Sequence, residues 1–179
     1  MKLKGFTLME LMITLVVLSI LATLAFINFT SYLASKKLET MAFRIYKYLN
    51  YYKIEAYKKE ASYIIKISSN GQYMVVYDDR NKNNVVETAD DPVIDTFFVY
   101  KTEDIGGTGV YLEASSNLIN NGIVFNADNL GFPPANSGSM YIKHKRLGDT
   151  KYYKITIPGG LNKINFYRFD SPSDSILLN

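Results

Sequence analysis

Apolar residues dominate the first part of the chain. Between residues 11 and 27 there is no charged residue, and the polar residues are only Thr14, Ser19 and Thr23. At about 1.5 Å per residue, a helix over residues 8–27 would be roughly 30 Å long, the thickness of the hydrocarbon core of a bilayer. No small-residue cleavage site follows the apolar core, as it would in a secretory signal peptide. We therefore expect a membrane-spanning helix here.

After this segment, apolar residues recur at helical steps of three and four, which indicates one buried stripe. The stripe consists of Leu38, Met41, Ile45, Leu49, Tyr52 and Ala56. Most basic residues lie off it, namely Lys36, Lys37, Arg44, Lys47, Lys53 and Lys58. Because neither Gly nor Pro interrupts residues 6–62, we expect one helix of about 55 residues. Its second part, residues 34–62, is expected to pack against a head domain through its tyrosines, which are Tyr46, Tyr48, Tyr51, Tyr52 and Tyr57.

From residue 63 the hydrophobic period changes to two, which is typical of strands. The pattern predicts strands at 63–67, 72–77, 93–100, 109–113, 122–126, 139–145, 152–157 and 163–169. Turn sequences such as Asn70-Gly71 and Pro158-Gly159-Gly160 separate them. Short strands after one long helix predict an α+β fold with an antiparallel sheet or sandwich as the head. The head would cover residues 63–170, and residues 171–179 are expected to be a loose C-terminal tail.

Composition excludes several classes of site. The chain has 179 residues, which fits one domain and an appendage. It has no cysteine and one histidine, His144, which excludes disulfides, thiolate metal sites and sites with several histidines. The net charge of +3 is too small to indicate nucleic-acid binding by itself. We find no catalytic constellation, expect neither an enzyme nor a cofactor, and interpret His144 as an exposed strand residue.

A short basic leader precedes the apolar segment. Lys2 and Lys4 would keep the N-terminus in the cytoplasm, with most of the chain on the other side of the membrane. Glu10 stands at the head of the apolar stretch, where an unpaired carboxylate costs about 2–3 kcal/mol. Two interpretations stay open: Glu10 reaches the lipid headgroups, or it meets a partner charge in an assembled state.

The sequence Gly5-Phe6-Thr7-Leu8-Met9-Glu10-Leu11 resembles the type IV prepilin cleavage and methylation motif. The resemblance implies that a prepilin peptidase cuts between Gly5 and Phe6 and methylates the new amine of Phe6. It also implies that Glu10 pairs with the Phe6 ammonium group of a neighbouring subunit. Residues 1–5 would then be the leader peptide and residues 6–33 the transmembrane and filament-core helix. The expected location is the bacterial inner membrane, with a single pass and the head in the periplasm or outside.

The head is similar to that of the type II secretion protein H / FimT-like minor pilins. The likeness rests on residues 54–59, on the acidic loop after Tyr77, on Gly122-Ile123-Val124-Phe125 followed by Gly131, and on the closing strand at residues 153–157 before Pro158. It implies a minor pseudopilin, a structural subunit of a type II secretion pseudopilus or a type IV pilus that supports protein secretion. The implied partners are the prepilin peptidase, other pilins and an inner-membrane assembly platform. The alternative is a DNA-binding minor pilin that serves DNA uptake.

Charge is unevenly distributed over the predicted head. Residues 71–113 carry nine acidic and three basic residues, whereas residues 138–170 carry seven basic and two acidic ones. Three interpretations stay open: solvated strand faces, complementary contacts between neighbouring heads, and contact with DNA. The nucleic-acid candidates are Lys143, Lys145, Arg146, Lys151 and Lys163. FimT-like proteins that take up DNA place arginines after the closing-turn glycine, and here only Lys163 follows Gly160, which weighs against DNA binding.

Residues 79–90 partly match a calcium-binding loop. Oxygen-bearing side chains stand at positions expected for ligands, namely Asp79, Asn81, Asn83 and Asp90. Asn84 occupies the place of the turn glycine, and two basic residues add positive charge to the loop. The sequence therefore leaves a weak calcium site and a solvated hairpin tip as alternatives.

Overall fold

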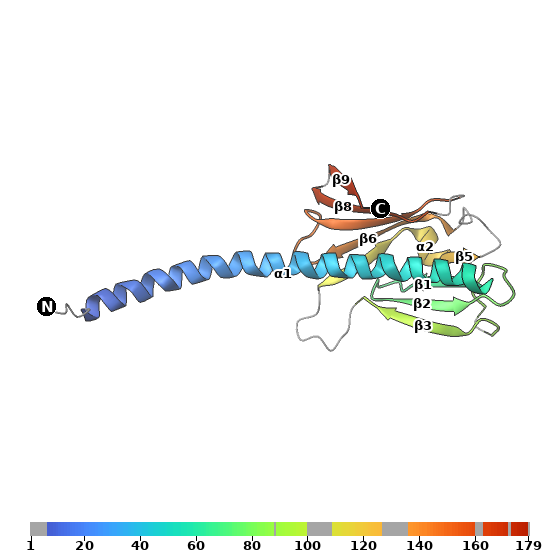
Figure 1. Cartoon of the computed structure of the whole chain (residues 1–179), viewed down its shortest axis with the longest axis horizontal. Coiled ribbons are helices and arrows are strands. Elements are labelled where there is room, and N and C mark those ends of the chain that lie inside the picture. The colour runs from blue at the N-terminus through green and yellow to red at the C-terminus, as the bar shows by residue number, and fades with distance from the viewer. Residues whose placement is uncertain are drawn as a thin grey trace. The chain divides into compact units, whose positions relative to one another are not determined.

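The computed structural model describes residues 7–87, 89–99, 109–126, 136–159, 163–171 and 173–178, apart from the side chains of residues 25–28 and 174. The chain divides into two compact units, Met1–Leu33 and Ala34–Asn179. Helix α1 (Leu8–Lys59) contributes its first part to one unit and its second part to the other (Figure 1).

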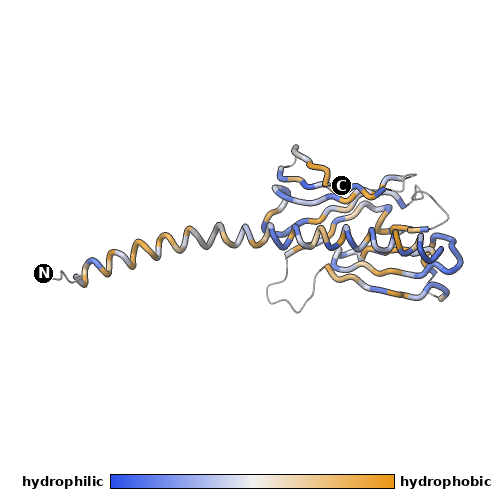
Figure 2. Tube along the Cα trace, in the orientation of Figure 1, coloured by the Kyte–Doolittle hydropathy of each residue, from blue (hydrophilic) through white to orange (hydrophobic). Residues whose placement is uncertain are grey.

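In the first unit, the described side chains of α1 up to Leu24 are exposed. They are mostly apolar, as the colouring of this segment in Figure 2 shows. The hydroxyl groups of Thr14, Ser19 and Thr23 donate hydrogen bonds of 2.7–2.9 Å to carbonyl oxygens three or four residues earlier in the helix. Such bonds satisfy the polar groups inside the helix, which a lipid environment requires. Among the described residues, α1 is the one helix long and apolar enough to cross a membrane.

The second unit contains the rest of α1, the short helix α2 (Ser116–Asn121) and two sheets. The first sheet has the order β3 (Val93–Phe98), β2 (Tyr73–Asp78), β1 (Ser62–Ile67) and β5 (Ile123–Asn126). The second has the order β4 (Val110–Ala114), β6 (Gly138–His144), β7 (Tyr152–Ile157), β8 (Asn165–Ser171) and β9 (Asp174–Leu177). Every strand pairing in both sheets is antiparallel.

The apolar stripe of α1 lies in the core that joins the helix to both sheets, as its spacing predicts. Leu38, Ile45 and Leu49 are fully buried, together with apolar residues of both sheets. Ring contacts fix the helix to each sheet. Tyr46 stacks on Phe166 of β8 with ring centroids 4.9 Å apart, and Tyr48 lies 4.7 Å from Phe97 of β3.

The α+β prediction is confirmed, and each of the eight predicted strands is present with ends shifted by at most two residues among the described positions. The prediction of a loose tail at residues 171–179 is wrong, because β9 pairs with β8 and the Leu178 N–H donates to the Phe166 carbonyl at 2.8 Å. Helix α2 was not predicted. It is only six residues long, and the burial of Leu118 holds it against the core.

The prediction that His144 is exposed is also wrong, since only 7% of the residue is accessible. Residues Met140, Ile142 and His144 alternate along β6 and share its buried face. The His144 ring packs against Gly109, where a Cβ atom would lie 2.8 Å from Nε2. The period of two that predicted the strand therefore also carried the signal for the burial of His144.

Candidate assembly surfaces

Glu10 lies in the first turn of α1, and its side chain is exposed. The Glu10 N–H donates to Thr7 Oγ1 at 3.2 Å and to the Thr7 carbonyl at 3.1 Å, so Thr7 caps the helix. A carboxylate in the first turn is favoured by the positive end of the helix dipole. The sequence signal for this role, a threonine followed three residues later by a glutamate, was missed. Gly5 and Phe6, the predicted processing residues, lie outside the described residues.

The exposed part of α1 that follows Glu10 is apolar on all sides. Its large exposed side chains include Leu11, Met12, Ile13, Leu15, Val16, Val17, Leu18, Ile20, Leu21 and Leu24. A helix that is apolar all round is stable only where lipid or other helices surround it. This surface and Glu10 at its start are therefore suited to a membrane or to a bundle of helices.

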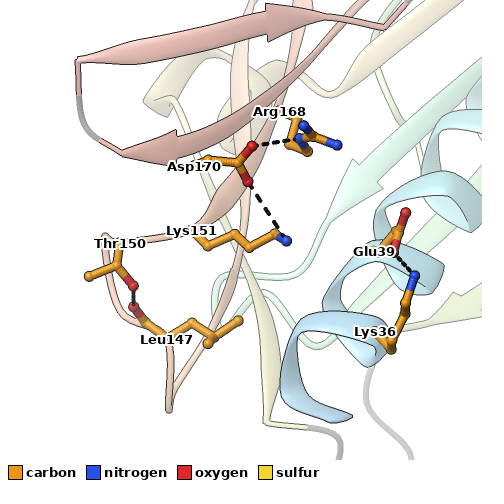
Figure 3. Close-up of polar contacts among 7 residues, drawn as sticks. All are labelled: Lys36, Glu39, Leu147, Thr150, Lys151, Arg168 and Asp170. Atoms are coloured by element: carbon orange, nitrogen blue, oxygen red, sulfur yellow. Dashed lines mark hydrogen bonds and ion pairs between the residues drawn. The ribbon is translucent and has the colours of Figure 1, made fainter. Parts of the chain in front are cut away.

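Two of the nucleic-acid candidates form ion pairs on the second sheet or in the turn between β6 and β7. Lys143 Nζ lies 2.8 Å from Glu113 and 2.9 Å from Asp149, and these carboxylates raise the pKa of Lys143. Lys151 lies 3.7 Å from Asp170, which also pairs with Arg168 at 2.9 Å. Figure 3 shows Asp170 between these two basic side chains.

The other three candidates, Lys145, Arg146 and Lys163, are exposed. Lys145 and Arg146 follow β6 directly, whereas Lys163 precedes β8. The aromatic ring of Tyr141, which lies near the basic residues, is already in contact with lysine side chains of the same chain. Tyr141 lies 5.5 Å from Lys154 Nζ and 6.0 Å from Lys143 Nζ. The basic segment is therefore less available to an outside anion than its composition suggests.

The loop that partly matches a calcium site is held by its own hydrogen bonds. Asp79 is 1% exposed, and its carboxylate accepts bonds from Ser62 Oγ and from the N–H groups of Asn83 and Asn84. The side chains of Asn81 and Asn83 donate to Glu87. Asp90 is exposed.

These hydrogen bonds satisfy the buried Asp79 carboxylate with donors from the chain itself. A second buried carboxylate, Asp91, accepts bonds from the N–H groups of Arg80 and Glu87, a role that the calcium pattern did not reveal. Within the described ranges, no group of three or more His, Cys, Asp or Glu side chains could hold a metal ion. Calcium binding stays a prediction from the sequence.

Asp95 of β3 connects the first sheet to α1. Its Oδ2 accepts hydrogen bonds from Tyr48 Oη at 3.0 Å and from Tyr52 Oη at 2.9 Å. Burial, followed by the hydrogen bond to Asp95, raises the pKa of both tyrosines above its usual value. The Tyr51 ring contacts the Tyr52 ring on the same helix, with centroids 5.1 Å apart, but neither Tyr51 nor Tyr57 is buried. They are strongly exposed, which corrects the prediction that all five tyrosines pack against the head.

Comparison with known proteins gives two matches, one in sequence and one in structure. Residues 1–26 match the family described as the prokaryotic N-terminal methylation motif. No curated protein matches the chain. The structure is similar to that of the minor pseudopilin EpsH from the type 2 secretion system of Vibrio cholerae, with a TM-score of 0.53 and 10% sequence identity. The match covers 77% of this chain and 99% of the EpsH chain.

The methylation motif and the likeness in fold agree with the geometry of α1 and the two sheets. The matched structure is that of a pseudopilin and not of an enzyme. The chain thus combines a prokaryotic N-terminal methylation motif at residues 1–26 with an α+β fold similar to that of the minor pseudopilin EpsH.

Proposed function

We propose that this chain is a minor pseudopilin that is cut between Gly5 and Phe6 and then enters a filament through α1. The observation that carries the proposal is the methylation motif at residues 1–26, which includes the start of a helix that exposes apolar side chains on all sides. Such a helix is stable in the inner membrane before assembly and in a bundle of helices afterwards.

Glu10 would select the position of the subunit in that bundle. A carboxylate in a low-dielectric bundle is tolerated only with a partner charge, and the new ammonium group of Phe6 in a neighbouring subunit would supply it. Contacts of this head-to-tail kind repeat along an open helix, so the activity of the protein would be assembly.

A secretion pseudopilus is the favoured system, because the similar fold of EpsH belongs to a minor pseudopilin of a type 2 secretion system. A type IV pilus is the other system that uses subunits of this kind. If the chain belongs to a secretion pseudopilus, deletion of its gene should reduce the secretion of exported proteins. If it belongs to a type IV pilus, the same deletion should reduce the number of surface pili and leave secretion intact.

DNA uptake is the second candidate function, and the exposed residues Lys145, Arg146 and Lys163 are what favours it. The ion pairs of Lys143 and Lys151 reduce the positive potential that DNA would meet. We therefore place assembly first and DNA binding second.

The test is the intact mass of the chain extracted from membranes, with and without a co-expressed prepilin peptidase. Processing should yield a product that begins at N-methylated Phe6. A Gly5→Val variant is the control, because a bulky residue before the cut should leave the leader attached. A wild-type chain that keeps residues 1–5 beside an active peptidase would contradict the proposal.

A further inference from the structure

Each sheet of the second unit has two edge strands, and an open edge can pair with a strand of another chain. Among the described strands, the edges are β3 and β5 in the first sheet and β4 and β9 in the second. Strands β5 and β9 have four residues each, and β4 is partly covered because the Leu112 N–H donates to the Gly71 carbonyl at 3.2 Å. Strand β3, at the outer edge of the first sheet in Figure 1, has six residues. It is therefore the edge best suited to pairing with a further strand.

The composition of β3 also favours pairing with another strand. Val93, Ile94 and Phe98 are large apolar residues that are 54%, 46% and 52% exposed. The exposed ring of Tyr73 on β2 lies beside Phe98, with ring centroids 6.2 Å apart. Lysine and proline, which protect many edge strands, do not occur in β3, and Asp95 is its one charged residue. Protection of this edge therefore depends on Asp95.

The backbone N–H groups of alternate residues along β3 point away from β2. The Val99 N–H donates to the Gln72 carbonyl at 2.9 Å, so the odd-numbered residues from 95 to 99 are those that pair with β2 by hydrogen bonds. Thr96 lies opposite Val75 between two such pairs, and its N–H therefore points to the open edge. A strand that pairs with this edge would have to accept a hydrogen bond from Thr96.

The Asp95 side chain already accepts the hydrogen bond of this N–H group. Asp95 Oδ1 lies 2.7 Å from the Thr96 nitrogen. The other carboxylate oxygen, Oδ2, accepts bonds from Tyr48 and Tyr52 of α1, which hold the carboxylate in place. Asp95 is exposed, so a strand laid along β3 would also have to cover its charge, which is unfavourable. The structure thus places a charged acceptor where a partner strand would need to bind.

We propose that Asp95 keeps the β3 edge closed to strand addition, and that without its carboxylate β3 pairs antiparallel with β3 of a second copy. In such a pair the two Asp95 carboxylates would lie on neighbouring strands, where like charges are destabilising. Once they are removed, no charge on β3 opposes contact between the exposed apolar side chains of the two copies. The proposal goes beyond assembly through α1, because it names the group that keeps two heads from joining their sheets.

The test compares cross-linking of the full-length chain with and without Asp95→Ala, both in detergent. Because the chain has no cysteine, Thr96→Cys in both proteins gives each a single thiol on β3. A short bis-maleimide then joins two copies whose β3 strands lie side by side. Dimers of the Asp95→Ala protein should exceed those of the protein that keeps Asp95 roughly tenfold, because a like-charge contact and a competing acceptor are both removed.

Further variants separate the open edge from a loss of stability. The double variant Tyr48→Phe and Tyr52→Phe loses the same hydrogen bonds between α1 and β3 but keeps the charge at the edge, so it should give no excess of dimers. Phe98→Lys restores a charge to the edge and should abolish the excess in Asp95→Ala. Asp95→Asn keeps the size of the side chain and loses the charge, so it should also give an excess and replaces Asp95→Ala if that variant does not fold. Near-UV circular dichroism checks the fold of each variant.

A folded Asp95 variant that gives no additional dimers would overturn the proposal. An equal excess in the double tyrosine variant would also overturn it, because loss of the contact with α1 and not an open edge would then be the cause. An excess that persists with Phe98→Lys would place the contact away from β3 and would overturn it as well. Cleavage after Gly5, measured by intact mass, does not depend on β3. Failure of the proposed function is thus distinguished from failure at this edge.

Discussion

Tyr52 of α1 donates a hydrogen bond to Asp95 of β3 across 2.9 Å, and Tyr48 one turn earlier donates to the same oxygen at 3.0 Å. The rings of the two tyrosines also contact each other, with centroids 5.0 Å apart. One carboxylate thus joins the helix to the edge strand of the first sheet.

Asp95→Ala should lower the free energy of unfolding by about 1–3 kcal/mol, because two partly buried hydroxyl groups lose their acceptor. Thermal unfolding of the full chain in detergent, followed by near-UV circular dichroism, measures the change. Asp90→Ala is the matched control, since Asp90 is exposed. Equal losses for the two variants would contradict a role of the hydrogen bonds.

Stability should fall as the pH rises above about 10, the usual pKa of tyrosine. Burial and Asp95 raise the pKa of Tyr48 and Tyr52 in the folded state, and burial raises that of Tyr153 to about 12. Above pH 10 the unfolded chain loses phenol protons that the folded chain keeps, so alkali favours unfolding. Below that pH the contribution is fully present.

The measurement is thermal unfolding from pH 8 to pH 11, together with the phenolate absorbance. The double variant Tyr48→Phe and Tyr52→Phe should be less sensitive to alkali, because it lacks two of the shifted phenols. A decline that is equally steep in the variant would show that other groups are responsible.

Gly71→Ala should destabilise the chain more than Gly148→Ala. Both glycines have positive φ, +65° and +53°, so both substitutions cost about 1 kcal/mol in backbone strain. At Gly71 the added Cβ would also lie 2.0 Å from the Leu112 carbonyl oxygen, whereas nothing lies within 4 Å at Gly148. Melting temperatures of the two variants give the comparison, and equal values would contradict the close approach of β4 to this turn.

Glu10→Gln should leave cleavage after Gly5 intact and reduce entry into filaments, because the amide removes the charge proposed to pair with a neighbouring Phe6 ammonium group. Sheared filament fractions probed for the processed chain measure the effect. Glu60→Gln removes an exposed carboxylate just after α1 and serves as the control. Normal assembly of Glu10→Gln would leave headgroup contact as the role of Glu10.

DNA binding by the full chain in detergent should be weak and salt-dependent. Lys145→Ala with Lys163→Ala should reduce this binding more than Lys143→Ala with Lys151→Ala, because the latter lysines are already in ion pairs with carboxylates. Gel shifts at several salt concentrations test this. A stronger effect of Lys143→Ala with Lys151→Ala would mean that the ion pairs open on binding.

Local patterns in the sequence were sufficient for α1 and for strands β1 to β8, but not for α2 or β9. The uncharged run of α1, the stripe from Leu38 to Ala56 and the alternation of β6 and β7 each depend on neighbours a few residues apart. The same is true of the methylation motif, which lies within residues 1–26. Helical and strand periods express which side of an element faces the core, so they can be read without knowing what the core contains.

Contacts between distant residues were decided by the tertiary structure alone. Lys143 meets Glu113 because β4 and β6 pair, and Asp95 meets Tyr52 because β3 lies beside α1. The sequence could count charges in each segment but could not tell which were already paired. The strand β9 likewise exists through its pairing with β8, since four residues hold no stable strand without a neighbour.

The amino-acid sequence by itself determined the long apolar helix, the predicted processing site and the α+β class. Folding decided which charges are paired within the chain. It paired Lys143 and Lys151 with carboxylates in the segment that the sequence marked as basic, and it left Lys37, Lys47 and Lys58 exposed along α1. The physical reason is that periodicity is a local property, whereas the partner of a charge is set by the residues that packing brings beside it.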